Sequence, residues 1–197
     1  MPTICLNMIV KNESRIITRL LDSVVQYIDS YCICDTGSSD NTPMIIEDYF
    51  NAKQIPGKVF SEPFQNFEYN RTFALEQCKS SNTDYVLLLD ADMIFVCNLD
   101  VETFKNALST HDCFYIFQGS DQMYYKNTRI VRNNGQCKYI GVTHEYVSIP
   151  DEMTQGMFAK EHVFINDIGD GGAKSDKFVR DVRLLKQGLV NDPMNVR

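Results

Sequence analysis

The stretch Asp84-Tyr-Val-Leu-Leu-Leu-Asp-Ala-Asp-Met93 directs the interpretation of the whole chain. Its apolar run, Tyr85 to Leu89, has the length of a strand buried on both faces, as in a parallel sheet. Residues two apart in a strand point to the same side, so we expect Asp90 and Asp92 to project together. Adjacent carboxylates repel unless a cation neutralises them, and Mg²⁺ or Mn²⁺ accepts one or two carboxylates plus water and phosphate oxygens. The stretch predicts a metal carrying a nucleoside diphosphate; the alternative is two solvated turn acids.

Composition limits the classes of protein that the chain can belong to. Its 197 residues are 44% hydrophobic and 23% charged, enough for one α/β domain with a sizeable core. The net charge of −7 argues against nucleic acid as the main partner. No apolar run approaches the roughly 20 residues of a transmembrane segment, and the start does not resemble a signal peptide. Seven cysteines without a CxxC pair predict buried thiols in the cytoplasm or another reducing compartment.

The first half of the chain alternates strands with helices. We expect a helix at 16–28 with Ser14 as its N-cap, a second helix that Thr42 caps, and a third at 68–79. This rhythm predicts a parallel sheet with right-handed crossovers, whose strand ends meet at one ligand-binding edge. The predicted strands end after Val10, Cys34, Ser61 and Leu89.

The second half has the pattern of short, largely antiparallel strands. Asp100 is expected to cap a helix that runs to Leu108, and Asn133-Asn-Gly135 is expected to form a hairpin turn. A last helix should begin at Ser175 and carry an apolar stripe of Phe178, Val182, Leu185 and Leu189. The predicted strands lie at 113–117, 122–125, 128–132, 137–140 and 163–167, with 141–147 continuing the sheet.

Four motifs give the chain a family resemblance. They are Ile4-Cys-Leu-Asn-Met-Ile-Val-Lys-Asn-Glu13, Asp35-Thr-Gly-Ser-Ser-Asp40, Tyr69-Asn-Arg71 and Leu89-Asp-Ala-Asp92. In order and spacing they resemble the nucleotide-sugar half of family 2 glycosyltransferases, and the similarity continues through Gly141-Val-Thr-His-Glu145 to about residue 188. Each motif alone is weakly specific; the four in this order are strongly so.

The resemblance implies a fold and an activity. The fold is the α/β GT-A fold of nucleotide-diphospho-sugar transferases, with a parallel Rossmann-like N-terminal half and a mixed or antiparallel C-terminal half. We expect a single domain over 1–197, in which 1–99 binds the nucleotide-sugar and 100–190 the acceptor. The implied reaction is inverting transfer of a hexosyl or N-acetylhexosaminyl group from a UDP-sugar to a hydroxyl of a glycan, protein or small molecule. Because related proteins often continue into helical repeats, we also expect a longer polypeptide.

The resemblance implies a donor site at the strand ends. Asp35 can accept from a base N–H or a ribose hydroxyl, and Arg71 offers a fork of donors to the base or diphosphate. Three residues of this site have an alternative structural role. Asp35 could be a turn residue, Arg71 could form a surface ion pair, and Glu13 could be a helix-start residue. The predicted nucleotide-binding residues are Val10, Asn12, Glu13, Asp35, Asn70, Arg71, Asp90 and Lys174.

The resemblance also implies a metal site. Asp92 should be the firmer ligand, and Asp90 should reach toward the ribose. Many relatives have a histidine and a glycine after the last strand, where this chain has Asn166-Asp-Ile-Gly169. Asp167 therefore replaces that histidine as an oxygen ligand, or the third protein ligand is absent. The predicted ligands of Mn²⁺ or Mg²⁺ are Asp92, Asp90, Asp167 and His144, and the metal would stabilise charge on the departing diphosphate.

Glu145 is the predicted catalytic base, acting together with Asp92. We expect His144 and Glu145 to alternate along an antiparallel strand on the acceptor side. The alternatives are a packed strand histidine and a cross-strand partner of Arg132. Residues 170–175 resemble a loop that closes over the diphosphate with Lys174 and Lys177, or a plain glycine hinge.

Two other functions fit parts of the sequence. A nucleotidyl- or phosphotransferase could use paired aspartates, but the segment from Val10 to Ser14 lacks the expected glycine-rich loop, and Met-Ile-Phe follows Asp92. A non-catalytic module that binds a nucleotide-sugar would have the same fold. Its only support is that Asp167 stands where many relatives have a histidine.

Overall fold

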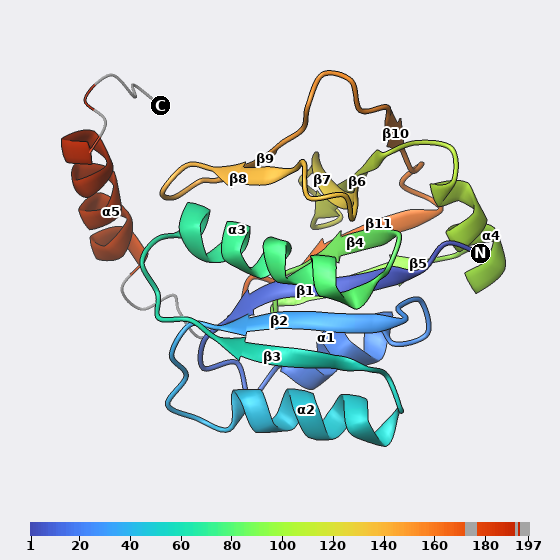
Figure 1. Cartoon of the computed structure of the whole chain (residues 1–197), viewed down its shortest axis with the longest axis horizontal. Helices are drawn as coiled ribbons and strands as arrows, with labels where there is room; N and C mark the ends of the chain where they lie inside the picture. Colours follow the sequence, from blue (N-terminus) through green and yellow to red (C-terminus); the bar gives the residue numbers. More distant parts are fainter. Residues whose placement is uncertain (172–176, 192, 194–197) are drawn as a thin grey trace.

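The computed structural model describes residues 1–171, 177–191 and 193 (Figure 1). The helices are α1 (Ile17–Val24), α2 (Thr42–Ala52), α3 (Phe67–Gln77), α4 (Val101–Leu108) and α5 (Lys177–Asn191), with a 3₁₀ helix at Cys78–Ser81. The strands are β1 (Ile4–Val10), β2 (Ser30–Asp35), β3 (Gly57–Ser61), β4 (Tyr85–Leu88), β5 (Met93–Cys97), β6 (Cys113–Gly119), β7 (Tyr124–Arg132), β8 (Lys138–Ile140), β9 (Tyr146–Ser148), β10 (Gln155–Met157) and β11 (Val163–Asp167).

One sheet runs through both halves of the chain. Its strand order is β3-β2-β1-β4-β7-β6-β11-β5, and β10 pairs with β6. The first four strands in this order are mutually parallel, which confirms the predicted parallel half. Their carboxyl ends therefore lie at one edge of the sheet, as expected. Antiparallel β7 joins β4 to β6, and β6 pairs in parallel with β11, so the second half is mixed.

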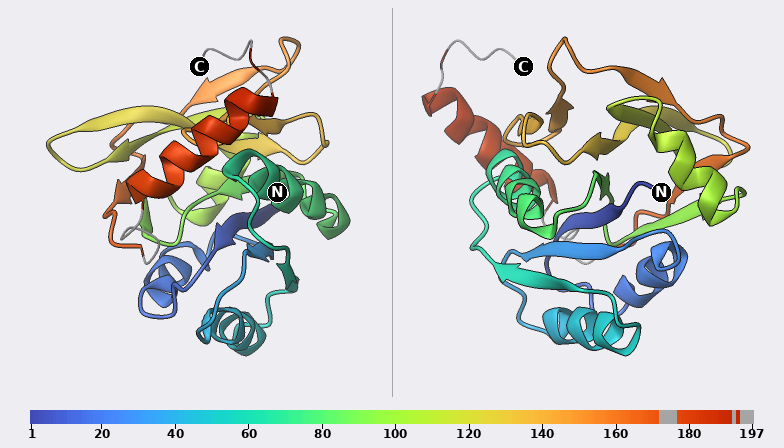
Figure 2. Two further views of the ribbon diagram at one scale, coloured as in Figure 1. Left: turned by 90° about the vertical axis from the view of Figure 1, so that its left-hand side faces the viewer. Right: turned by 45° about the vertical axis from the view of Figure 1, so that its right-hand side comes forward.

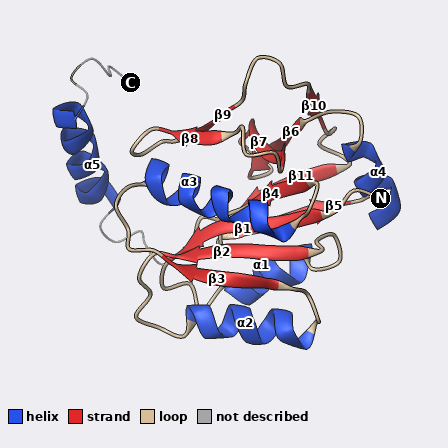
Figure 3. Ribbon diagram, viewed as in Figure 1, coloured by secondary structure: helices blue, strands red, loops and turns tan. Residues whose placement is uncertain are grey.

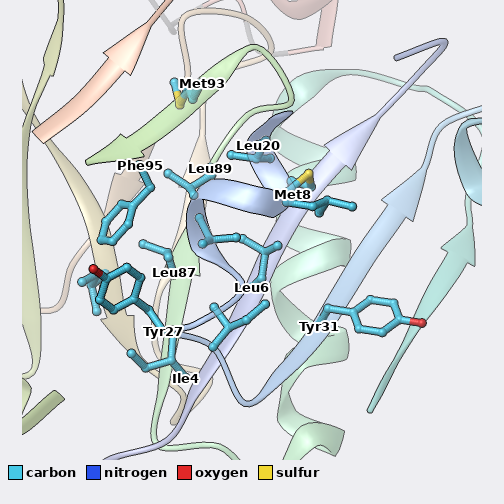
Figure 4. Packing of buried hydrophobic residues seen from close by; sticks show 14 of the residues in the cluster. Ile4, Leu6, Met8, Leu20, Tyr27, Tyr31, Leu87, Leu89, Met93 and Phe95 are labelled. Carbon is cyan, nitrogen blue, oxygen red and sulfur yellow. The ribbon is translucent and has the colours of Figure 1, made fainter. Parts of the chain in front are cut away.

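Helices cover both faces of the parallel strands (Figure 3). Alternate side chains of β1 point to opposite faces, so Ile4, Leu6 and Met8 pack with α1 while Cys5 packs beneath α3. Figure 4 shows the first of these clusters, which Leu87 and Phe95 complete. On the other face the buried amide of Asn7 donates to the carbonyls of Cys32 and Ala74, at 2.8 and 2.9 Å, and ties α3 to the sheet.

The second half differs from the sequence prediction in its pairing. The predicted strands at 122–125 and 128–132 are one strand, β7. The expected hairpin at 133–135 does not form, because β8 pairs with β9 in a separate two-stranded sheet and not with β7. Strand β5, directly after the two aspartates, was not predicted at all.

The sheet curls so that its last strand, β5, packs against α1, the helix that also packs on β1. Four residues separate β4 from β5 in the chain, yet β7, β6 and β11 lie between them in the sheet. The Phe95 backbone N–H donates to the Ser23 hydroxyl of α1 at 3.1 Å. Tyr27, after α1, packs edge-on against Phe95 and Phe104, with ring centroids 5.5 and 5.3 Å away. The turn at residues 89–92 therefore connects the middle of the sheet to its last strand, which packs against α1.

Both terminal helices depart from expectation. Helix α1 ends at Val24 instead of Ile28, and its N-cap is Ile16, not Ser14. The predicted apolar stripe of α5 is exposed: Phe178 by 84% and Val182 by 51%, whereas Asp181 and Leu184 are buried. All seven cysteines are free thiols and six are buried, as expected. None of the helices in the described part of the chain has the length and apolar character needed to cross a bilayer.

Asp40 generates a prediction about stability. Thr42, the predicted N-cap, is instead the first residue of α2, and its N-cap is Asn41. The carboxylate of Asp40, just before the cap, accepts from the Thr42 hydroxyl at 2.6 Å and from the backbone N–H groups of Thr42 and Ser14 at 3.0 and 3.2 Å. Desolvation alone would raise the pKa of Asp40, but the hydrogen bonds from Ser14 and Thr42 lower it to about 2. We expect Asp40→Ala to lower the free energy of unfolding by about 1 kcal/mol at neutral pH.

The pH dependence of that difference has a defined sign. The folded-state pKa lies below the ordinary value of 3.8, so the stabilisation is complete above about pH 4 and is lost as the pH falls toward 2. Urea denaturation of both proteins between about pH 5 and pH 2.5 measures it, with Asp48→Ala on the exposed side of α2 as control. A difference that stays constant over this range would contradict the assignment.

Candidate active site

A cavity of about 990 Å³ lies at the carboxyl edge of the parallel strands. It extends from the ends of β1 and β2 to the 143–145 loop and is covered on one side by α5. Figure 2 shows α5 beside α3; the Arg180 guanidinium stacks on the Phe67 ring, 4.9 Å from its centroid. The lining includes Val10, Lys11, Asn12, Glu13, Thr36, Phe64, Arg71, Asp90, Asp92, Thr143, His144, Glu145, Gly171, Lys177, Arg180, Asp181 and Arg183.

The two aspartates lie in a turn and not on the strand. Strand β4 ends at Leu88, and the Met93 N–H donates to the Asp90 carbonyl at 3.1 Å, which closes the turn before β5. The expected strand alternation is therefore wrong, although both carboxylates line the cavity. Different neighbours hold them: Asp90 contacts arginines, and Asp92 Oδ2 accepts from the Gly171 N–H at 3.4 Å.

Arg71 on α3 links Asp90 to Glu145. Its Nη2 donates to Asp90 Oδ1 at 2.5 Å, and its Nε donates to Glu145 Oε1 at 2.6 Å. The Arg71 side chain is only 13% exposed, so these carboxylates compensate a guanidinium largely withdrawn from water. Burial alone would raise the pKa of Asp90, but Arg71 and Arg129 hold that pKa below its ordinary value. Burial likewise opposes the charge on Arg71, yet Asp90 and Glu145 raise its pKa, so the Arg71 guanidinium stays charged.

His144 and Glu145 occupy a loop, which corrects the predicted strand. The loop runs between β8 and β9, and His144 has a left-handed backbone with φ of 53°. Left-handed geometry breaks strand alternation, so both residues line the cavity. Neither alternative holds: Arg132, the alternative partner of Glu145, binds Asp112 at 2.8 Å, and the exposed His144 is not a packed strand residue. Arg71 reaches Glu145 because the Gly141 N–H donates to Glu68 of α3 at 2.7 Å, which holds the loop against that helix.

The ends of β1 and β2 form the opposite wall of the cavity. The Val10 carbonyl accepts from the Thr36 N–H at 2.9 Å, and Asn12 accepts from the Ser39 N–H at 2.7 Å. The Asp35 carboxylate accepts from the backbone N–H of Ser38 at 3.1 Å, so this residue has the turn role that was its alternative. Thr36, and not Asp35, is the cavity-lining residue of this turn among the described residues.

Glu13 and Asp92 approach each other around Gly171. A Cβ placed on this glycine would lie 3.2 Å from Asp92 Oδ2 and 3.3 Å from Glu13 Oε1. The two carboxylates thus flank a space that a side chain at 171 would enter. Within the described ranges no three His, Cys, Asp or Glu side chains cluster to hold a metal ion. Asp167 ends β11, and in the described part of the chain neither it nor Asp90 or His144 belongs to such a cluster with Asp92.

Two predicted nucleotide contacts fall elsewhere. Asn70 is completely buried; its Oδ1 accepts from the Gln65 N–H at 2.9 Å, and its Nδ2 donates to the Pro63 carbonyl at 3.1 Å. It holds the 62–65 loop, and the predicted nucleotide contact has no support in its placement. Lys174 lies outside the described residues, as does Ser175, whereas Lys177 lines the cavity.

Sequence reasoning overlooked Arg129. It lies on β7 within a buried run, and it is 6% exposed. One available signal was a charge inside the apolar stretch Thr128-Arg-Ile-Val131, since a buried arginine requires acceptors. The α5 cations Arg180 and Arg183 were also missed; their helix was predicted, but not its position over the cavity.

The chain matches a family model and a curated relative. The family model described as glycosyl transferase family 2 matches residues 5–165. The SPbeta prophage-derived glycosyltransferase SunS of Bacillus subtilis is 28% identical over 151 residues, which cover 73% of this chain. The match covers 34% of SunS, so the chain spans about a third of that relative.

Solved structures share the fold. Residues 1–349 of S. aureus TarS, crystallised in complex with UDP, superpose with a TM-score of 0.62 at 16% identity, covering 96% of this chain and 66% of that one. GalNAc-T7, solved with UDP, GalNAc and Mn²⁺, superposes with a TM-score of 0.57 at 9% identity, covering 94% of this chain and 48% of that one. These likenesses confirm the predicted GT-A fold class.

Replacing Asn70 separates a structural role from ligand contact. We expect Asn70→Ala to lower the free energy of unfolding by about 2 kcal/mol, because it leaves buried polar groups of the 62–65 loop without their hydrogen-bond partner. Affinity for UDP, measured by calorimetry on the folded variant, should change by less than about 3-fold, since an interaction not made with the ligand contributes nothing to its binding. Wild-type stability combined with a large loss of UDP affinity would instead make Asn70 a ligand contact.

Proposed function

The chain belongs to the family 2 glycosyltransferases, and on this basis we propose that it transfers the sugar of a UDP-sugar to a hydroxyl acceptor, with UDP as the leaving group. One observation carries the proposal: Asp92, Asp90 and Glu145 line a single cavity at the carboxyl edge of a parallel sheet. Its volume of about 990 Å³ suits a nucleotide-sugar with part of an acceptor. UDP is favoured as the nucleotide because a structural neighbour was crystallised with it.

The donor is proposed to lie along the wall formed by β1 and β2. The Asp35 turn and Asn12 would face the nucleoside, and Asp90 the ribose. The diphosphate would then lie near Asp92, with Lys177, Arg180 and Arg183 of α5 among the lining groups. These cations can balance phosphate charge in a chain whose net charge is −7.

The residues at the proposed diphosphate position fit Mn²⁺ or Mg²⁺. Such ions often take one or two protein carboxylates and complete their coordination with phosphate and water. Asp92 and Glu13 flank one space, so a cluster of three protein ligands is not required. Asp92 is the proposed ligand; Asp90, His144 and Asp167 remain predictions. The metal would supply Lewis-acid stabilisation of the leaving diphosphate, and a structural neighbour holds Mn²⁺.

Glu145 is proposed to take the proton from the acceptor hydroxyl. Arg71 occupies its Oε1, while Oε2 has no hydrogen-bond partner among the described residues. One oxygen is thus fixed and the other can accept the proton, which suits direct displacement with inversion.

The metal requirement gives the first functional test. We expect UDP to bind more tightly with Mn²⁺ than without it, and Asp92→Ala to abolish that difference, because the variant lacks the proposed ligand carboxylate. Isothermal titration calorimetry measures this, with the exposed Asp151→Ala as a control for loss of one negative charge. If UDP binding depends neither on Mn²⁺ nor on Asp92, the proposed metal site at Asp92 is ruled out.

The role of Glu145 gives the second functional test. Glu145→Gln retains an oxygen that can accept from Arg71 but loses basicity, so donor hydrolysis and transfer should fall about 10²- to 10⁴-fold. UDP affinity should stay near wild type. Rates come from UDP release with UDP-glucose or UDP-N-acetylglucosamine as donor. If affinity falls instead, Glu145 is misassigned; if the wild type binds UDP without cleaving either donor, a non-catalytic module is favoured.

A further inference from the structure

Arg129 is a buried cation for which the proposed chemistry has no direct use. Its side chain is 8% exposed, and its position on β7 places it beside β4. It donates from Nε to Gln118 Oε1 at 2.6 Å and from Nη1 to the Leu88 carbonyl at 3.2 Å. These neutral acceptors fix the guanidinium to two strands. Neither neutralises its charge, so a buried guanidinium here also needs a carboxylate.

Asp90 supplies that carboxylate. Arg129 Nη1 lies 3.5 Å from Asp90 Oδ2, while Arg71 Nη2 binds the other oxygen, Oδ1. Asp90 is therefore held between an arginine of the sheet and an arginine of α3. Arg71 in turn binds Glu145, so charges alternate along a chain of four residues from the sheet interior to the loop.

We propose that Arg129 is a positioning residue that, through Asp90 and Arg71, fixes the Glu145 carboxylate. This proposal rests on the role of Glu145 in the proposed function. Arg129 is not among the cavity-lining residues, so it acts through its partners. Without Arg129, Asp90 keeps only Arg71, and one guanidinium must satisfy two carboxylates with no rigid anchor behind them. Arg71 can then shift toward either carboxylate, and the Glu145 oxygen moves with it.

The planar fork of Arg129 explains why lysine cannot substitute fully. The guanidinium contacts Gln118, Leu88 and Asp90 in fixed directions. A lysine ammonium keeps the charge but, as a single point of donors on a flexible stem, cannot hold all three acceptors in that arrangement. Positioning therefore depends on the shape of the side chain as well as on its charge.

Steady-state kinetics of the 197-residue chain tests the proposal. With UDP-glucose or UDP-N-acetylglucosamine as donor and Mn²⁺ present, Arg129→Met should lower kcat about 10- to 100-fold, the usual effect of a displaced catalytic group. KM for the donor should change less than kcat does, because Asp90, at the proposed ribose position, keeps its contact with Arg71 while the base of the chemical step loses its fixed position. Arg129→Lys, which keeps the buried charge, should fold even if Arg129→Met does not, and should recover kcat only in part.

A double-mutant cycle separates positioning from general damage. If Arg129 acts through Glu145, adding Arg129→Lys or Arg129→Met to Glu145→Gln should lower kcat by less than about 3-fold more. Tyr125→Phe is the matched control: it removes the hydroxyl that accepts from Gln118 Nε2 at 2.7 Å and leaves the Arg129 contacts in place. Unchanged kcat in the Arg129 variants, or fully additive losses in the cycle, would overturn the proposal while leaving Glu145 as base.

Hydrogen exchange decides the question even if the chain cleaves neither donor. Arg129→Lys should speed amide exchange across residues 141–146, because Arg71, which binds the Glu145 carboxylate of this loop, is no longer held in a fixed position, whereas Tyr125→Phe should not. Exchange in this loop that matches wild type in the Arg129 variant would refute the positioning role. Failure of the proposed function would show differently, as absence of Mn²⁺-dependent UDP binding in the wild type.

Discussion

The Arg71 guanidinium holds two carboxylates from parts of the chain that are far apart in sequence. Asp90 follows β4 and Glu145 lies in the loop after β8, and both bind a side chain that is 13% exposed. Buried ion pairs of this kind contribute little net stability, because desolvation offsets most of their attraction. They do specify geometry, since any other arrangement leaves a charge unpaired in the interior. Neither carboxylate can leave Arg71 without leaving a charge unpaired in the interior, and the cavity therefore keeps its shape.

This network also gives the two aspartates of the motif different roles. Asp90 faces two arginines and is ionised without a metal, whereas Asp92 points toward Glu13 and Gly171. Two acids separated by one alanine thus have different electrostatic surroundings. The turn makes this possible, because on a strand both side chains would have faced one side. The charge of Asp90 belongs to the protein framework, and that of Asp92 lies where a diphosphate–metal pair is proposed.

Sequence patterns predicted the parts of the fold that depend on local signals. Strand β4 and the parallel edge were predicted because apolar runs ended in polar residues, and the Asp100 cap is confirmed by its 2.9 Å bond from the Thr103 N–H. Strand β5 was missed because the turn at 90–92 contains neither glycine nor proline. The Glu145 loop and the Asn70 amide depend on contacts with residues that no periodicity reveals. The aspartates, Arg71 and Glu145 were all found in the cavity, but their mutual pairing and the presence of Arg129 required the three-dimensional arrangement.

The turn at residues 89–92 has a consequence for how the protein folds, because it joins strands that are distant in the sheet. Strands β4 and β5 are neighbours in the chain, but within the described residues β5 pairs with β11 alone, which is formed by residues 163–167. Loop closure between such distant segments is slow compared with the formation of local helices. The turn that carries both aspartates therefore reaches its final geometry late in folding. We expect a chain emerging from the ribosome to lack the finished cavity until β11 has been synthesised and inserted.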